Sequence, residues 1–276
     1  MARYLNPFTD FGFKKLFGNE QNKDLLISFL NQILPDNQIS TINYLRTEHL
    51  GQTDLDRKVI YDLYCENERG EKFIVALQKA KQSFFKDRTL FYATFPIQQQ
   101  AQQGDWNYEL KAVYTVAVLD FCFDDEDRDK VKVQVKLMDT DKKTVFYNKL
   151  TFLYLQMPNF RKNEEELETL EDKWFYLLRH LAEFQNRPQR LQEKIFDRLF
   201  EAAEIAKFDP QERQAYEDSL RYYRDVKNSL DTAREEGREQ ERIAIARRML
   251  AKGFSPTQIS EVTGLTQAEI ELLSKH

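Results

Sequence analysis

Apolar positions recur at helical spacing in the first 35 residues. In PFTDFGFKKLFG the apolar residues line one helical face, and Thr9 or Asp10 stands where a helix would begin. KDLLISFLNQIL repeats this spacing and is closed by Pro35. The pattern therefore predicts two amphipathic helices near the amino terminus.

Strand patterns follow, with one helix between them. RKVIYDLYCE and EKFIVALQ predict a hairpin around NERG, with Gly70 at the turn. KAVYTVAVLDF and KVKVQVKLMD predict two more strands, and the second alternates apolar with charged residues, as a half-solvated edge strand does. Residues 38–50 are also strand-like, and a helix is expected over about 82–103, ending at Gly104.

From about residue 162 onward every pattern is helical. NEEELETLEDKWFYLLRHLAEF predicts a helix with acidic first turns, and residues 211–250 form a long charged stretch interrupted by Gly237. Two short helices are expected near 256–262 and 267–275, each opened by a capping box. We therefore expect an α/β core over 1–160, a helical extension packing on it over 161–209, and a long charged helix with a helix-turn-helix-like pair over 210–276.

Composition and charge limit the classes of protein to which the chain can belong. The chain has 276 residues, with 41 basic and 46 acidic side chains and a net charge of −5. Its overall charge therefore gives no indication that it binds nucleic acid. No apolar run approaches the ~20 residues that span a bilayer, and the amino terminus lacks the apolar core of a secretion signal. We expect a cytoplasmic protein.

Polar side chains interrupt two of the apolar strands. Asp62 lies inside VIYDLYCEN, and Ile74, Ala76 and Gln78 share one face of the strand FIVALQ. A buried acid is costly unless it binds a cation or collects hydrogen bonds, and a hard ion such as Mg²⁺ prefers carboxylate and carbonyl oxygens. A second acid at position 76 would converge with Asp62 on one ion. The pattern is that of a metal-dependent phosphodiester-cleaving site from which one ligand is missing.

TDFGFKKLFG, KDLLISFLNQIL and the stretch from VIYDLYCEN to VYTVAVLDF together resemble the PD-(D/E)XK nuclease family transposases, the Rpn-type recombination-promoting nucleases. The resemblance covers residues 6–160 in detail, and the charged tail with LAKGFSPTQISEVTGLT is also similar. It implies a restriction-endonuclease-like α/β core, with a central mixed sheet flanked by helices, followed by an all-helical C-terminal region. It also implies a DNA endonuclease that uses Mg²⁺, or Mn²⁺ or Ca²⁺, in recombination or mobile elements.

The resemblance assigns a role to each polar position. Asp62 looks like the first metal ligand, position 76 like the catalytic glutamate, and Gln78 stands where other nucleases have lysine. Asp10 matches an N-terminal acidic position, and Leu77 would add its backbone carbonyl to the metal. The implied reaction is metal-assisted hydrolysis. Because Ala76 replaces the expected glutamate, we expect this sequence to be catalytically dead, whether the change is natural or engineered.

Four basic residues are candidates for contact with DNA. Since glutamine carries no charge, Lys79 or Lys81 is a candidate for the missing positive charge, although strand alternation turns Lys79 away from the site. Lys86 and Arg88, in FFKDRTLFYATF, are expected on the solvent side, where phosphate contact is available.

Each site residue also has a structural interpretation. Asp62 could be an acid bonded to a turn, Gln78 could satisfy an edge hydrogen bond, and Asp10 could cap the first helix. We favour the site roles for Asp62 and Gln78 and leave both interpretations of Asp10 open. For the whole chain, the alternatives to an endonuclease are a non-catalytic DNA-binding or regulatory homologue and a helical interaction scaffold.

The tail ISEVTGLTQAEIELL has helix-turn-helix spacing with Gly264 in the turn. A helix that enters the major groove usually offers basic or amide side chains, whereas this one offers Gln267, Glu269 and Glu271, with Lys275 as its only basic residue. Repulsion from phosphates therefore favours packing or self-association, and we expect a homo-oligomer through these helices.

Overall fold

The computed structural model of the chain describes residues 2–36, 38–49, 59–101, 104, 106–123 and 129–274. These residues form two compact units, 1–223 and 224–276. Within the described ranges, no helix combines the length and the apolar character that crossing a membrane requires.

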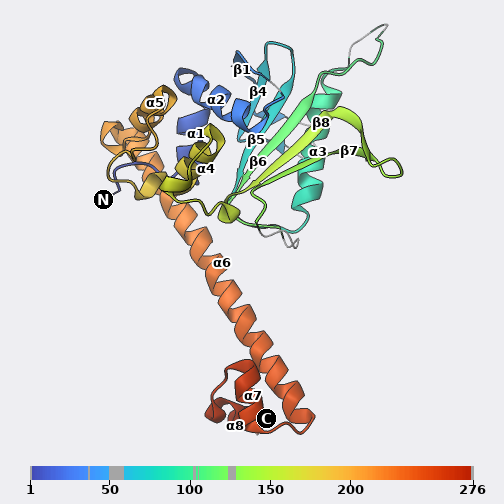
Figure 1. The fold of residues 1–276 in the computed structure, drawn as a ribbon, viewed down its shortest axis with the longest axis vertical. Helices are drawn as coiled ribbons and strands as arrows, with labels where there is room; N and C mark the ends of the chain where they lie inside the picture. The colour runs from blue at the N-terminus through green and yellow to red at the C-terminus, as the bar shows by residue number, and fades with distance from the viewer. Residues whose placement is uncertain are drawn as a thin grey trace. The chain divides into compact units, whose positions relative to one another are not determined.

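A six-stranded mixed sheet forms the centre of the first unit (Figure 1). In spatial order its strands are β1 (Ile42–Tyr44), β4 (Leu63–Asn67), β5 (Lys72–Gln78), β6 (Val113–Leu119), β8 (Thr144–Gln156) and β7 (Lys132–Asp139). β5, β6 and β8 run parallel to one another, whereas the pairs β1–β4, β4–β5 and β7–β8 are antiparallel. The expected mixed sheet is confirmed. Two short strands, β2 (Glu48–His49) and β3 (Val59–Ile60), pair separately.

Helices flank this sheet. One group shares the main apolar core with β5, β6 and β8, and consists of α1 (Asp10–Phe17), α2 (Lys23–Ile33), α4 (Leu170–His180) and α5 (Lys194–Ala203). On the opposite face lies α3 (Phe85–Gln98) (Figure 1). Its Phe85 and Ala93 pack on residues of β6 and β8. Strand alternation separates the two faces: Val75 and Leu77 enter the main core, while Ile74 packs with aromatic side chains on the α3 side.

The hairpin and the edge strand agree with the sequence pattern. β4 and β5 pair antiparallel, and Gly70 at their turn has a φ of +77°, which glycine adopts without steric cost. β7 lies at the end of the strand order and pairs with β8 alone. Its alternating charged and apolar residues therefore occupy the edge, as predicted.

Four elements differ from the pattern. The single strand expected over RKVIYDLYCE is divided at residues 61–62 into β3 and β4, which belong to different sheets. β8 is not predicted, because its exposed first half mixes polarities and its buried second half is a short apolar run without a period of its own. The helix expected over 82–103 begins only at Phe85, because Phe84 adopts a left-handed φ of 60°, and it ends at Gln98. α4 begins at Leu170, where Thr169 supplies a capping box, instead of at residue 163.

The long helix α6 (Pro210–Ala251) continues through Gly237 without interruption, so the expected break is wrong. Its first residues belong to the first unit, because Tyr216 and Tyr223 are buried in the main core. In the second unit, the end of α6 packs with α7 (Pro256–Thr263) and α8 (Gln267–Ser274) around a small apolar core. The capping boxes predicted before α7 and α8 are both present.

Candidate active site

Asp62 lies just before β4, next to Ala76 of β5. The register pairs Leu63 with Val75, so Asp62, in the bend before β4, lies next to Ala76, and both residues line the same cavity. The Oδ2 atom of Asp62 accepts the backbone N–H of Leu77 at 2.7 Å. The sheet therefore holds this carboxylate at the position expected for the first ligand.

The environment of Asp62 disfavours its charged form. Burial raises the pKa of the Asp62 carboxyl above its usual range; the Leu77 N–H opposes this shift and the Asp10 carboxylate adds to it. Because the folded-state pKa is raised, the contribution of Asp62 to stability is largest below its unfolded-state pKa and is lost as the pH rises through the folded-state pKa. As the pH rises towards neutrality, this pH-dependent part of the contribution of Asp62 to stability is therefore lost.

We expect Asp62→Asn to raise the Tm by a few degrees at neutral pH in EDTA, because asparagine removes the buried charge and still offers an oxygen to the Leu77 N–H. The gain should shrink as the pH falls towards 4. Thermal melts across that pH range check this, with Asp62→Ala as the control that leaves the N–H without its acceptor. A Tm for Asp62→Asn equal to or below that of the unchanged protein would contradict this interpretation.

Ala76 is half-buried and lines a cavity of about 160 Å³ between β5 and α3. Asp62, Gln78, Arg88 and Thr115 contribute polar groups to the same wall. Among the described residues, Asp62 is the sole acid in that lining. The cavity therefore holds one carboxylate beside a methyl group, where two carboxylates would converge on an ion.

Gln78, the last residue of β5, is held at both ends of its amide. Its Nε2 donates to the carbonyl of Ala80 at 2.9 Å, and its Oε1 accepts a hydrogen bond from Arg88. Arg88 also donates to Oε1 of Gln82 at 2.6 Å. The structure thus places Arg88 at the cavity wall instead of on the open solvent side where the sequence put it.

Lys79 and Asp10 form an ion pair close to Asp62, and Asp10, Asp62 and Leu77 line one small pocket. The Lys79 Nζ lies 2.8 Å from Oδ2 of Asp10 and 4.9 Å from the centre of the Tyr222 ring. Lys79 therefore points away from the cavity, as strand alternation requires. The cap of α1 is Thr9, which accepts the Gly12 N–H at 3.0 Å, so Asp10 is the first helical residue and not the cap.

The remaining basic candidates lie outside the cavity wall. Lys81 and Lys86 are both exposed, and the Nζ of Lys86 lies 4.8 Å from the centre of the Phe123 ring. Thr115 also lines the cavity beside Ala76 and is not among the residues predicted from the sequence. The only signal for it was a single hydroxyl inside the apolar strand VYTVAVL.

These donors do not fit a divalent ion. Within the described parts of the chain, no group of three or more His, Cys, Asp or Glu side chains is placed to hold a metal. Asp62 supplies one carboxylate, Gln78 directs its amide oxygen to Arg88, and Asp10 is paired with Lys79. Hard cations require a fuller set of oxygen ligands than this.

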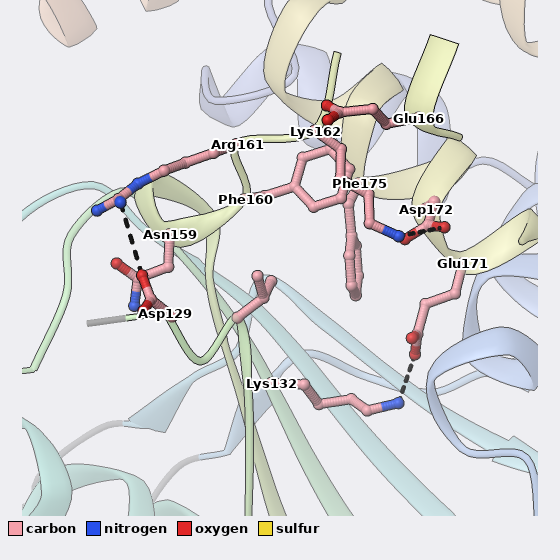
Figure 2. A pocket seen from close by; sticks show the side chains of 11 residues that line it. Asp129, Lys132, Asn159, Phe160, Arg161, Lys162, Glu166, Glu171, Asp172 and Phe175 are labelled. Carbon is pink, nitrogen blue, oxygen red and sulfur yellow. Dashed lines mark hydrogen bonds and ion pairs between the residues drawn. The ribbon is translucent and has the colours of Figure 1, made fainter. Parts of the chain in front are cut away.

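A larger cavity, of about 420 Å³, lies between the start of β7 and α4 (Figure 2). Three ion pairs lie in its wall: Lys162 lies 2.8 Å from Asp172, Lys132 is paired with Glu171, and Arg161 approaches an aspartate. The fourth acid of the wall, Glu166, accepts the backbone N–H of Asn163 at 2.8 Å. Figure 2 shows these pairs within the wall. Three of its four acids are therefore committed to ion pairs, which leaves no group of free carboxylates among the described residues of this wall.

A central mixed sheet with flanking helices, whose hairpin brings Asp62 beside position 76, is the fold of a PD-(D/E)XK nuclease. The family model of the PD-(D/E)XK nuclease family transposases matches residues 7–233, and the chain belongs to this family. Residues 239–275 match the C-terminal HTH domain of the Rpn/YhgA-like nuclease family. Searches of curated proteins and of solved structures gave no match. Nucleases of this fold typically use divalent metals.

Proposed function

We propose that this chain binds DNA through a nuclease fold that has lost phosphodiester hydrolysis. The family supplies the nuclease type of fold and a context of recombination or mobile elements. One observation carries the loss of activity: Asp62 faces the methyl group of Ala76, where the family pattern has a second carboxylate. Metal-assisted hydrolysis depends on an ion that polarises the phosphate and activates water, and a lone carboxylate holds such an ion weakly.

The test uses the unchanged protein on supercoiled plasmid and on a labelled duplex. We expect retarded migration of both DNAs and no nicking with Mg²⁺, Mn²⁺ or Ca²⁺. Asp62→Asn, prepared in parallel, identifies contaminating nucleases, because cleavage that persists in this variant does not come from the site. Metal-dependent nicking by the unchanged protein that disappears in Asp62→Asn would show an active enzyme and overturn the proposal.

For the tail, we propose that residues 210–276 bring copies of the chain together, while 1–160 carry the site and 161–209 support it. The match to an HTH domain suggests DNA binding by the tail. Glu269 and Glu271 on α8 are exposed, however, and would face the phosphates of a bound duplex. Self-association through the helices of the tail would not bring these glutamates close to phosphates.

A shortened chain tests the role of the tail. It should end at Tyr223, because Tyr216 and Tyr223 pack in the main core and an earlier end would damage it. We expect the shortened chain to be monomeric and the full chain to be oligomeric in light scattering. Equal oligomeric states for the two chains would exclude this role.

A further inference from the structure

Arg88 is a cation that faces the cavity without a carboxylate partner. Its guanidinium donates to the neutral amides of Gln78 and Gln82 and lies 5.4 Å from the ring centre of Phe85. No acidic side chain of the described residues forms an ion pair with it. By contrast, Lys79 is neutralised by Asp10. At the cavity wall, Arg88 is therefore bonded to neutral amides, while Asp62 of the same wall accepts the Leu77 N–H.

The amide of Gln78 fixes the direction of this guanidinium. Because Nε2 of Gln78 is committed to the Ala80 carbonyl, its Oε1 must face Arg88. A planar guanidinium has five N–H donors, so two hydrogen bonds to amides leave others for a phosphate, which guanidinium binds in a bidentate manner. Gln78 thus acts as a support for Arg88.

Thr115 provides a second polar group in the same cavity. Its side chain is 2% exposed, and its Oγ1 has no hydrogen-bond partner within the described residues. Buried hydroxyls are rarely left unpaired, because desolvation without a partner is costly. Since Thr115 lines the cavity beside Arg88, a ligand there would meet an unsatisfied hydroxyl as well as a cation.

We infer that Arg88 binds a backbone phosphate of DNA at this site, supplying the positive charge that a metal ion supplies in active nucleases. Gln78 positions the guanidinium, and the site therefore takes phosphodiester without a divalent ion. This inference rests on the proposed DNA-binding function and deepens it. Phosphate is the anion that matches a forked guanidinium donor, and the nuclease fold brings DNA to this face.

Fluorescence anisotropy of a labelled duplex with the full-length protein, over a series of salt concentrations, tests the inference. We expect equal affinity in EDTA and in Mg²⁺. Arg88→Gln should weaken binding about tenfold at low salt, as expected for losing a charged hydrogen bond. It should also lower the slope of log K against log salt by about 0.9, the value for one phosphate contact. Arg88→Lys should keep the slope but lose affinity, because lysine lacks the fork.

Arg198→Gln is the matched control. Arg198 lies on α5, on the main-core side of the sheet, and its guanidinium is 2.8 Å from Asp24. This variant should bind DNA as the unchanged protein does. If Arg88→Gln keeps the original slope and affinity, or if binding requires Mg²⁺, the inference is wrong while the proposed function stands. If the unchanged protein binds no duplex in either buffer, both are wrong. Should Arg88→Gln fail to fold, Arg88→Lys decides by affinity alone: a Kd equal to that of the unchanged protein would make the inference wrong.

Discussion

Replacing Ala76 with glutamate is expected to give the protein Mg²⁺-dependent nicking of supercoiled plasmid DNA. The register brings position 76 next to Asp62, and the cavity of about 160 Å³ offers room for the longer side chain. Two converging carboxylates satisfy a hard ion far better than one. Loss of a preorganised transition-state contact typically costs about 100- to 1,000-fold in rate, so the gain should be of that order.

The stability of Ala76→Glu also distinguishes a metal site at position 76 from a purely structural role of β5. An added acid without an ion is buried and unpaired, so the Tm of Ala76→Glu should fall in EDTA and recover when Mn²⁺ binds. Ala76→Gln is the control of similar shape that lacks the charge, and Ala76→Glu combined with Asp62→Asn should lose the nicking again. A folded Ala76→Glu protein that leaves plasmid and duplex intact with Mg²⁺ and Mn²⁺ would reject the site.

Gly12→Ala is expected to destabilise the first unit by roughly 3 kcal/mol, because the added carbon has no space. A Cβ at position 12 would lie 2.2 Å from the Asn6 carbonyl oxygen and 2.7 Å from Oγ1 of Thr9. Both atoms belong to the cap of α1, in which Thr9 donates to that carbonyl and accepts the Gly12 N–H. The clash is with backbone, so relief requires moving the cap.

Thermal melts measure this effect, and a fall in Tm of about 6 to 12 °C is expected for a unit of this size. Gly237→Ala is the matched control: nothing lies within 4 Å of a Cβ there, in an exposed part of α6. Alanine should stabilise that helix by about 0.5–1 kcal/mol and leave the melting of the first unit unchanged. A Gly12→Ala protein that melts like the unchanged one would show that the cap is not rigid.

Local sequence patterns predict much of the fold. The hairpin of β4 and β5 follows from two apolar runs around Gly70, and the edge position of β7 follows from its alternating charges. Capping residues predicted the starts of α7 and α8 for the same reason, since a cap acts within a few residues. The juxtaposition of Asp62 and Ala76 also needs only the hairpin register.

Features that depend on contacts between segments far apart in the sequence could not be predicted from local patterns. β8 is long because β6 and β7 both pair with it, and no local period marks such a strand. The contact between Arg88 and Gln78 depends on how α3 is rotated against the sheet. The pair of Lys79 with Asp10 likewise joins β5 to a helix far away in sequence.

Calorimetric titration with Mn²⁺ tests most directly whether the missing carboxylate leaves the site without a metal. We expect the unchanged protein to show no tight binding. Asp62 is the sole acid that the described residues place in the cavity beside Ala76, and the nearby Asp10 is paired with Lys79. Ala76→Glu should bind Mn²⁺ at one site, and adding Asp62→Asn should abolish that site. Tight one-site binding by the unchanged protein that survives Asp62→Asn would contradict the assignment of this site.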